Sequence, residues 1–339
     1  MSRRLPCCLL LALLALWAWS PSARAATVCT ATTPTVLAFG NVSATQTTDT
    51  VTSFAVTCST AALAVLSNTK VRLCVGLGPG SIDTSLSPRR MRSAAGDTLN
   101  YQLYLDPARS QIWGALGNAV NAVLVLDFDY AVPLIIGGSQ AQTVTIYGRI
   151  PANQALAAGS YGSTFAGAST VLTYAANTPL LGAAASFPAA CNVAGATTTN
   201  DAFPFVVSAN VPGQCYAYSA SDLDFGSVAG FIAANVDQTS AIGLTCTRRT
   251  AWQLGLDNGS NALLGQRRMR QGATSQYVNY DLYLDPARSQ RWGNTLNTDT
   301  LQGTGAGTPQ TTTVYGRVPS GQSAAAGSYS DTITVTITY

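Results

Sequence analysis

Few side chains in this 339-residue chain are of the types that do chemistry. It has no histidine, all of its acidic residues are aspartates, and Lys70 is its only lysine. Without imidazole the chain can build neither a Ser-His-Asp nor a Cys-His nucleophile, and it has no imidazole metal site. Two features remain as candidates for chemistry, namely the pair Asp127 and Asp129 and the arginine clusters at 89–92 and 267–270.

The aspartate pair could serve acid–base chemistry or bind a cation. In a strand, residues two apart point to the same face, so Asp127 and Asp129 would stand side by side. A glycosidase instead needs two separately tuned carboxylates that face each other across a cleft. We therefore interpret the pair as solvated carboxylates and expect no enzyme, no cofactor and no metal site.

The arginine clusters could bind anions, but they belong to a passage that the chain contains twice. An Arg-Arg-Met-Arg run, a Tyr-x-Leu-Tyr-Leu-Asp-Pro-Ala-Arg-Ser-Gln run and a Trp-Gly pair stand at 89–92, 101–111 and 113–114, and again at 267–270, 280–290 and 292–293. The copies are 178 to 179 residues apart, which predicts two tandem domains of one fold. Because each cluster has the same place in both copies, we expect a structural role, with Arg109 and Arg288 pairing carboxylates.

Residues 1–25 have the pattern of a secretory signal peptide. Arg3 and Arg4 precede an apolar run from Leu5 to Trp19, and Ala23-Arg24-Ala25 has the small-x-small form of a cleavage site. Without the three arginines of this leader, the chain has 15 basic and 15 acidic residues and a formal net charge of zero. A basic surface for nucleic-acid binding is therefore not expected. No later run approaches the roughly 18 to 20 apolar residues of a membrane span. The sequence predicts an exported protein without a membrane anchor.

The cysteines beyond the leader have spacings that repeat. Cys29 and Cys58 are 29 residues apart, and Cys215 and Cys246 are 31 apart, so we pair them within their own domains. Closing such loops is worth roughly 3 to 4 kcal/mol in the chain-entropy model. Cys74 and Cys191 remain as candidates for a third bridge, from domain 1 to the segment leading into domain 2, although the sequence does not determine this connectivity.

The composition favours strands over helices. Charge is low, Thr, Val, Ala, Ser and Gly are abundant and Glu is absent. Short alternating strands with Gly and Pro turns, in units of this size, predict an all-β chain of two tandem immunoglobulin-like antiparallel sandwiches. We expect an N-terminal domain at 26–198 and a C-terminal domain at 199–339.

Domain 1 is the longer copy, and its extra segments are apolar. It has about 11 more residues between its Trp-Gly and Tyr-Gly-Arg motifs and ten more between Cys58 and Arg89. Exposed apolar loops on a rigid sandwich often bind partners. The alternative is that 123–128 is a buried strand, with Pro133 turning the chain. The candidate binding residues are Val123, Leu124, Val125, Leu126, Phe128, Tyr130, Val132, Leu134, Ile135, Ile136, Leu63, Val65 and Leu66.

Taken in order, these motifs resemble the spore coat protein U domain, the pilin-type domain of archaic, Csu-type, chaperone-usher pili. The matching marks include the Cys…Leu-Asp-Phe-Gly…Cys opening, Tyr-Gly-Arg-x-Pro, and the ending from Gly327 to Tyr339. Two-domain members resemble tip adhesins, so the resemblance implies a subunit at the pilus tip that supports surface attachment and biofilm formation. It implies transit through the periplasm to the cell surface, with a periplasmic chaperone, an outer-membrane usher, an adjacent pilin subunit and an abiotic or host surface as partners. A structural coat or shaft subunit is the alternative.

In such pilins the sandwich lacks its last strand, and a donor strand from another chain fills the groove. The final run of the chain alternates, with Ile333, Val335, Ile337 and Tyr339 on one face, and we expect this face to line a donor-strand and chaperone groove in the C-terminal domain. The alternative is that 331–339 is the last strand of a complete fold.

The mature chain would have about three residues before Cys29, so we expect it to receive a strand and not to give one. A second segment with donor-like alternation, 203–211, lies inside the chain. It either fills domain 1 in cis or begins domain 2, and the sequence does not choose between these two placements.

Overall fold

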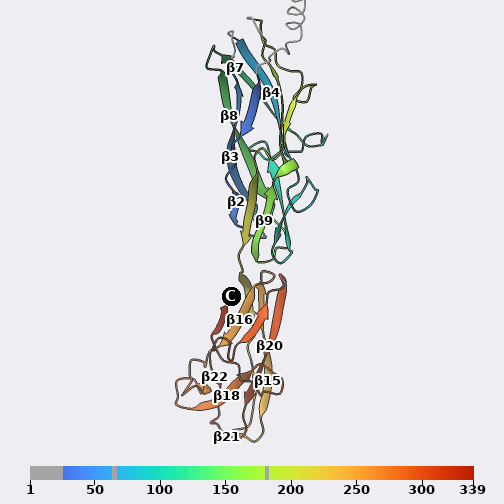
Figure 1. The fold of residues 1–339 in the computed structure, drawn as a ribbon. Helices are drawn as coiled ribbons and strands as arrows, with labels where there is room; N and C mark the ends of the chain where they lie inside the picture. The colour runs from blue at the N-terminus through green and yellow to red at the C-terminus, as the bar shows by residue number, and fades with distance from the viewer. Residues whose placement is uncertain (1–25, 63–66, 119, 180–182) are drawn as a thin grey trace, which may run out of the picture.

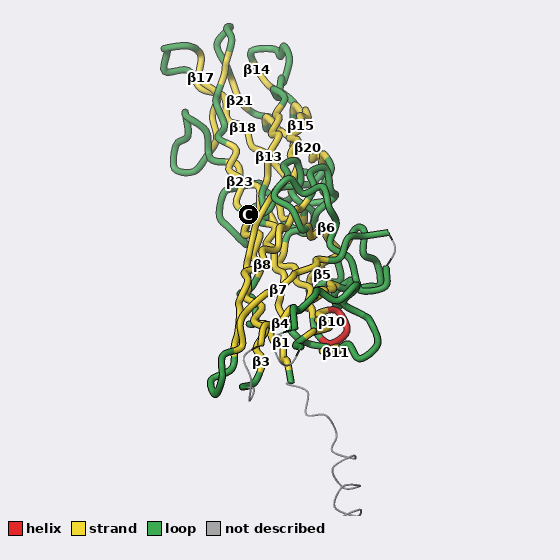
Figure 2. The backbone as a smooth tube through the Cα atoms, turned by 90° about the horizontal axis from the view of Figure 1, so that it is seen from above, coloured by secondary structure: helices red, strands yellow, loops and turns green. Residues whose placement is uncertain are grey.

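The computed structural model describes residues 26–62, 67–118, 120–179 and 183–339, and within them the chain forms two β domains placed end to end (Figure 1). Regular structure in the described residues is strand except for one 3-10 turn, Gly167–Ser169 (Figure 2). The all-β prediction is therefore confirmed. No helix in this part of the chain is long and apolar enough to cross a membrane.

Domain 1 is a sandwich of an eight-stranded and a four-stranded sheet. The larger sheet has the order β1-β3-β8-β6-β5-β9-β12-β2, and the smaller one β11-β10-β4-β7. The strands are β1 (Thr27–Ala31), β2 (Leu37–Asn41), β3 (Thr48–Thr60), β4 (Ser67–Leu77), β5 (Arg89–Ser93), β6 (Thr98–Tyr104), β7 (Leu124–Val132), β8 (Gly138–Ile150), β9 (Gly159–Phe165), β10 (Thr170–Asn177), β11 (Thr197–Thr199) and β12 (Phe205–Val211).

Domain 2 repeats this plan with fewer and shorter strands. Its main sheet has the order β13-β15-β20-β18-β17-β22, its opposite sheet β19-β16-β23, and β14 pairs with β21. The strands are β13 (Cys215–Ala220), β14 (Phe231–Ile232), β15 (Val236–Cys246), β16 (Ala251–Leu256), β17 (Arg267–Gln271), β18 (Tyr277–Tyr283), β19 (Leu301–Thr304), β20 (Pro309–Val318), β21 (Gln322–Ser323), β22 (Tyr329–Ser330) and β23 (Val335–Thr338).

Strand β12 completes the larger sheet of domain 1. It runs antiparallel to β9 and parallel to β2, and so closes the gap between strands that come from opposite ends of the domain sequence. Its period-two pattern explains the fit, because Phe205, Val207, Ala209 and Val211 are buried while Val206 is exposed. The alternating segment 203–211 therefore provides a strand of domain 1 from within the same chain.

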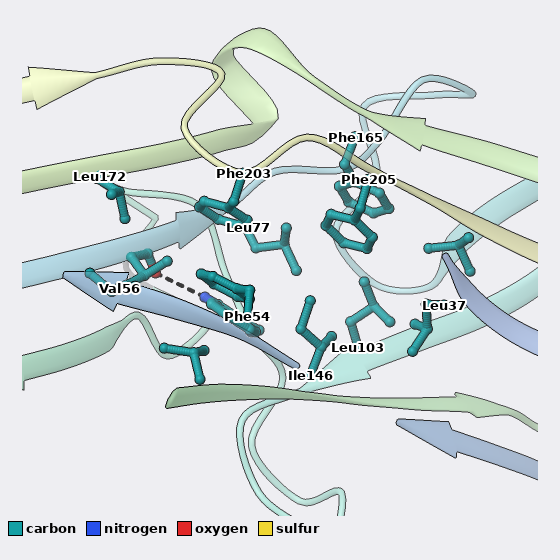
Figure 3. Packing of buried hydrophobic residues seen from close by; sticks show 14 of the residues in the cluster. Leu37, Phe54, Val56, Leu77, Leu103, Ile146, Phe165, Leu172, Phe203 and Phe205 are labelled. Atoms are coloured by element: carbon teal, nitrogen blue, oxygen red, sulfur yellow. Dashed lines mark hydrogen bonds between the residues drawn. The ribbon is translucent and has the colours of Figure 1, made fainter. Parts of the chain in front are cut away.

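Phe203, two residues before β12, anchors this strand in the aromatic centre of domain 1 (Figure 3). The Phe203 ring stacks on Phe54 with centroids 4.7 Å apart and on Trp113 at 6.5 Å, and Phe205 stacks on Phe165 at 4.7 Å. Such pairs stabilise the fold beyond the area that they bury.

The packing of β12 corrects the expected domain boundary at 198/199. The hydrophobic core of domain 1 includes Phe203 to Val211, and the core of domain 2 begins at Cys215. Domain 1 thus extends to Val211, and Pro212-Gly213-Gln214 connects the domains. At the junction, the carboxylate of Asp97 forms ion pairs with Arg248 and Arg249.

The repeated arginine at the start of each cluster is a buried structural residue. Arg89 donates to the carbonyls of Leu77, Gly78 and Trp113 at 2.7 to 3.0 Å, and to the side-chain oxygen of Gln102 at 2.6 Å. Burial lowers the pKa of the Arg89 guanidinium to about 10, so it stays protonated at neutral pH.

Arg267 repeats this arrangement in domain 2. It donates to the carbonyls of Leu256, Asp257 and Trp292, and its ion pair with Asp281 stands where domain 1 has Gln102. Burial lowers the pKa of Arg267, and Asp281 opposes that shift. The structural interpretation of the clusters agrees with these contacts.

The repeated Asp-Pro-Ala-Arg passage forms a turn that is tied to the sheet. Arg109 donates to the carbonyl of Gly148 and lies 3.4 Å from Asp49, and Arg288 donates to the carbonyl of Gly316 and lies 3.2 Å from Asp237. Both arginines pair carboxylates, as the sequence analysis expected.

The structure contains three disulfides, in the pairs set out from the sequence. Cys29 bonds to Cys58 and Cys215 to Cys246, and in each pair the two residues are direct partners across neighbouring strands. The third bridge joins Cys74 on β4 to Cys191. It fastens the segment before β11 to the smaller sheet of domain 1.

The contacts of Arg89 predict that Arg89 contributes far more to the stability of domain 1 than its neighbour Arg90 does. Arg89→Ala leaves several buried carbonyls without donors, so we expect a loss of at least about 3 kcal/mol in the free energy of unfolding of domain 1. Arg90→Ala, at an exposed position of the same strand, should change it by less than about 0.5 kcal/mol. Denaturant unfolding of the two variants measures the difference, and similar losses would contradict the structural role.

Candidate functional site

The groove that β12 fills in domain 1 has a counterpart in domain 2. Leu37 and Phe39 of β2 pack over Gly148, so closely that a Cβ added to this glycine would lie 2.8 Å from the Phe39 ring. Leu223 and Phe225 pack over Gly316 in the same way, and a Cβ added to Gly316 would lie 2.6 Å from the Leu223 side chain. These contacts match the Leu-x-Phe-Gly motifs of the two domains in space. Among the described residues, however, no strand pairs with 223–226.

The counterpart groove is open. Two cavities of about 510 and 440 Å³ lie along it, and both are lined by Leu223, Phe225, Met269 and Tyr329. The shared lining places the two cavities next to each other in domain 2. The remaining walls mix polar and apolar residues, and the larger apolar ones include Ile242, Tyr280, Leu282, Val314, Ile333 and Val335 in one cavity and Ile232, Val236, Val278 and Val318 in the other.

Burial differs between equivalent residues of the two grooves. Leu37, Met91 and Tyr161 are 0 to 2% exposed in the closed sheet of domain 1, whereas Leu223, Met269 and Tyr329 are only half-buried. The strands differ as well, because β9 has seven residues and its equivalent β22 has two. A strand without a hydrogen-bonded neighbour on one side loses ladder pairing, which explains the short β22.

The residues predicted to line this groove divide into two pairs. Ile333 and Val335 line the larger cavity, whereas Ile337 lies further along β23, paired with Leu254 of β16. Tyr339 is 58% exposed and lies at a separate hollow beside Trp252. Four further residues line this groove that were not predicted, namely Leu223, Phe225, Met269 and Tyr329. The repeat of Leu37 and Phe39 at 223 and 225 is the sequence signal that points to two of them.

The groove of domain 2 also contains a polar cluster. Asp331 lines the larger cavity, where its carboxylate accepts hydrogen bonds from the Tyr280 hydroxyl at 2.8 Å and from the backbone and side-chain amides of Asn261 at 3.1 and 2.9 Å. Burial raises the pKa of Tyr280, and the neighbouring Asp331 adds to the rise. The Tyr280 hydroxyl is therefore a neutral hydrogen-bond donor to the aspartate.

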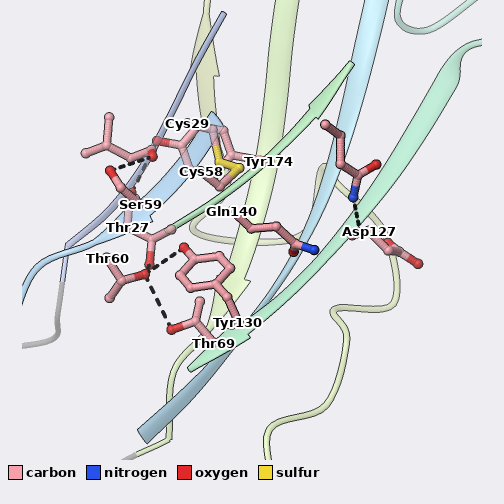
Figure 4. Close-up of a disulfide and its surroundings, with 12 residues drawn as sticks. Thr27, Cys29, Cys58, Ser59, Thr60, Thr69, Asp127, Tyr130, Gln140 and Tyr174 are labelled. Carbon is pink, nitrogen blue, oxygen red and sulfur yellow. Dashed lines mark hydrogen bonds between the residues drawn. A yellow bond between two sulfur atoms is a disulfide. The ribbon is translucent and has the colours of Figure 1, made fainter. Parts of the chain in front are cut away.

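The apolar insertion of domain 1 is mostly a buried strand, which corrects part of the prediction. Residues 124–132 form β7, which pairs antiparallel with β4. Phe128, Tyr130 and Val132 point inward and are 0 to 7% exposed, so they cannot act as surface-binding residues. The Tyr130 hydroxyl lies 2.8 Å from the Thr60 hydroxyl, close to the Cys29–Cys58 disulfide (Figure 4). Val123 is half-buried, Leu124 and Leu126 pack partly against the core, and Val125 is 51% exposed.

The turn after β7 is apolar and exposed. Leu134, Ile135 and Ile136 are 41, 88 and 81% exposed, and they connect β7 to β8 at the end of domain 1 away from domain 2 (Figure 1). Ile135 has φ 75°, a left-handed conformation that β-branched residues rarely adopt. Leu63, Val65 and Leu66 lie outside the described residues.

The outer face of β4 and β7 carries the aspartate pair. Arg72 contacts both carboxylate oxygens of Asp127 at 2.8 Å, and Lys70 lies 2.6 Å from Asp129. The hydrogen bonds from these basic groups lower the pKa of both carboxyls. The two carboxylates are thus ion-paired on a surface, and the described residues contain no group of three or more metal-ligating side chains.

Comparison with known proteins defines the family. Residues 17–167 and 201–336 each match the Spore Coat Protein U domain. The chain belongs to this family. The second Spore Coat Protein U domain match begins at residue 201, before β12. Strand β12 is therefore part of the second match in the sequence, but in the structure it belongs to the sheet of domain 1.

Relatives outside the chain are similar to different extents. Protein U of Myxococcus xanthus is 35% identical over 145 residues, which are 39% of this chain and 80% of that protein. Among solved structures, the CsuC–CsuE chaperone–tip adhesion subunit complex of archaic Csu pili from Acinetobacter baumannii has 16% identity and a TM-score of 0.45, covering 92% of this chain and 100% of that chain. The CupB6 tip adhesin from Pseudomonas aeruginosa has 10% identity and a TM-score of 0.34, covering 93% of this chain and 95% of that chain.

The two Spore Coat Protein U domains offer a matched test of the open groove. Met91 is 0% exposed beneath β12, and Met269 has the same place in the open groove. We expect Met91→Ala to lower the free energy of unfolding of domain 1 by about 2 to 5 kcal/mol, because it leaves a closed cavity. Met269→Ala should cost domain 2 about 1 kcal/mol or less, because its side chain is partly hydrated already. Equal losses in calorimetric unfolding would show that the second groove is closed.

Proposed function

We propose that the chain is the tip adhesin subunit of an archaic chaperone-usher pilus, which supports surface attachment and biofilm formation. Domain 2 anchors the subunit to the fibre by accepting a donor strand, and the apolar turn 134–136 of domain 1 contacts the surface. The observation that carries this proposal is the difference between the two grooves: the chain fills one with its own strand β12, and the other stays open.

An open groove of this kind favours strand addition. Its edges present unpaired backbone N–H and C=O groups and its floor is apolar, so an extended segment with alternating apolar residues satisfies both. Strand β12 shows that this geometry works in the same fold. The donors would be a periplasmic chaperone during assembly at the usher and an adjacent pilin subunit in the fibre. The disulfides agree with an exported protein, because they form in oxidising compartments.

The apolar turn has features that folding alone does not favour. Its two isoleucines are more than 80% exposed, and Ile135 occupies a backbone conformation that suits glycine better. Strain of this kind costs of order 1 to 3 kcal/mol and is common at binding sites. The turn also lies at the end of the molecule opposite domain 2 (Figure 1), where an anchored subunit would present it to a surface.

Replacing Ile135 tests its role in surface attachment without destabilising domain 1. Ile135→Gly relieves the positive φ, so we expect the free energy of unfolding of domain 1 to stay the same or to rise by about 1 kcal/mol. We expect attachment of cells to an apolar surface to fall several-fold, because the variant removes the most exposed apolar side chain of the turn. Crystal-violet or flow-cell attachment assays, with pilus quantity measured in parallel, read out this effect.

The matched control is Val51→Thr, which changes another exposed apolar residue, on strand β3 and outside the candidate binding residues. It should leave attachment within the error of the wild type. Normal attachment by Ile135→Gly and by a Leu134→Ser, Ile135→Ser, Ile136→Ser triple variant would remove the turn from the binding site. A subunit found along the whole fibre, and not at its ends, would favour the structural coat or shaft alternative.

A further inference from the structure

The two grooves differ at one inward-facing position. Ser163 of β9 is 2% exposed beneath β12 in domain 1, and the equivalent position in domain 2 is Asp331. The match rests on the shared order Gly159-Ser-Tyr161 and Gly327-Ser-Tyr329, which places 163 and 331 four residues after the glycine in both copies. Both side chains also lie beside a glycine of positive φ, Gly80 and Gly259.

Strand β12 shows which residue of an inserted strand meets this position. Val207 is the direct partner of Ser163 across the β9–β12 pair, and both side chains are buried. Directly opposed residues of an antiparallel pair point to the same face, with Cβ atoms roughly 4.5 to 5.5 Å apart. A strand that fills domain 2 in the same register therefore places one inward side chain against the Asp331 carboxylate.

Filling the groove changes the surroundings of Asp331. It is now half-buried, whereas its equivalent Ser163 is almost completely buried beneath β12. Within the described part of the chain no basic side chain lies within ion-pairing distance of Asp331. Three hydrogen bonds from Asn261 and Tyr280 occupy part of its acceptor capacity, which is about four sites for a carboxylate. An apolar side chain such as valine would bury the remaining site without a donor, which is costly.

We propose that Asp331 biases the choice of the strand that enters domain 2, by favouring a short hydrogen-bond-donating side chain, threonine or serine, over an apolar one opposite it. This inference rests on the proposed function, since it specifies the partner of the same groove. The occupant is an extended segment of another protein chain with large or branched apolar residues at alternate positions and one hydroxyl-bearing residue among them. Strand β12, which has Val207 at that position, is by this rule a poorer fit for domain 2 than the same strand with threonine there.

A fusion that uses the full chain tests this rule. A flexible linker and a copy of residues 197–211 are appended after Tyr339, with either Val or Thr at the position of Val207; the two side chains are nearly isosteric. Calorimetry follows the unfolding transitions of both domains, and a fusion with a polar linker of the same length is the control. The same fusions are made in the Asp331→Ser variant, which gives domain 2 the residue of domain 1.

We expect both fusions to raise the unfolding temperature of domain 2 above the control, and the Thr fusion to raise it by roughly 5 °C more than the Val fusion. In Asp331→Ser the Val fusion should do as well as the Thr fusion or better. Equal effects of Val and Thr in the unchanged chain would overturn the selection by Asp331 and leave strand acceptance standing. No effect of any fusion would overturn strand acceptance, and the selection with it.

Discussion

The structure depends on one interaction, the insertion of β12 between β2 and β9. These two strands come from opposite ends of the domain 1 sequence, and without β12 each would present an unpaired edge above an open apolar core. Phe203 and the inward residues of β12 close that core, and the hydrogen bonds of β12 satisfy both edges. Domain 2 has the same two edges, formed by 223–226 and 327–333, and the described chain provides no strand for them.

Much of the remaining structure is common to both domains and supports the sandwich without distinguishing one from the other. The buried arginines 89 and 267 hold the same set of carbonyls, the disulfides join the same pair of strands, and the turn arginines 109 and 288 reach the same glycine carbonyl. The proposed function therefore rests on places where the copies differ. Among them are the inserted strand, the exposed turn at 134–136, and the exchange of Ser163 for Asp331.

The sequence predicts the parts of this structure that local pattern or repetition determines. The all-β class, the duplication, the structural role of the arginines and the Cys29–Cys58 and Cys215–Cys246 pairs follow from spacing and from residue type, whereas the Cys74–Cys191 bridge does not. The placement of β12 does not, because the alternation at 203–211 fits either a strand of domain 1 or the first strand of domain 2, and only tertiary packing decides. The burial of Phe128, Tyr130 and Val132 is similar: an apolar run with aspartates at alternate positions suits a half-buried strand, but its length suggested a loop. The groove residues of domain 2 come from segments about a hundred residues apart, so that no local pattern reveals them together.

Hydrogen exchange of backbone amides in the purified full chain tests the central claim most directly, because equivalent segments of the two domains can be compared within one molecule. The account predicts slow exchange in β9 and β12, whose amides are paired, and exchange several orders of magnitude faster at 223–225 and 331–333. It further predicts that a fused donor strand slows exchange at 223–225 and 331–333 and leaves β9 unchanged. Equal protection of the two grooves in the chain without a donor would contradict it.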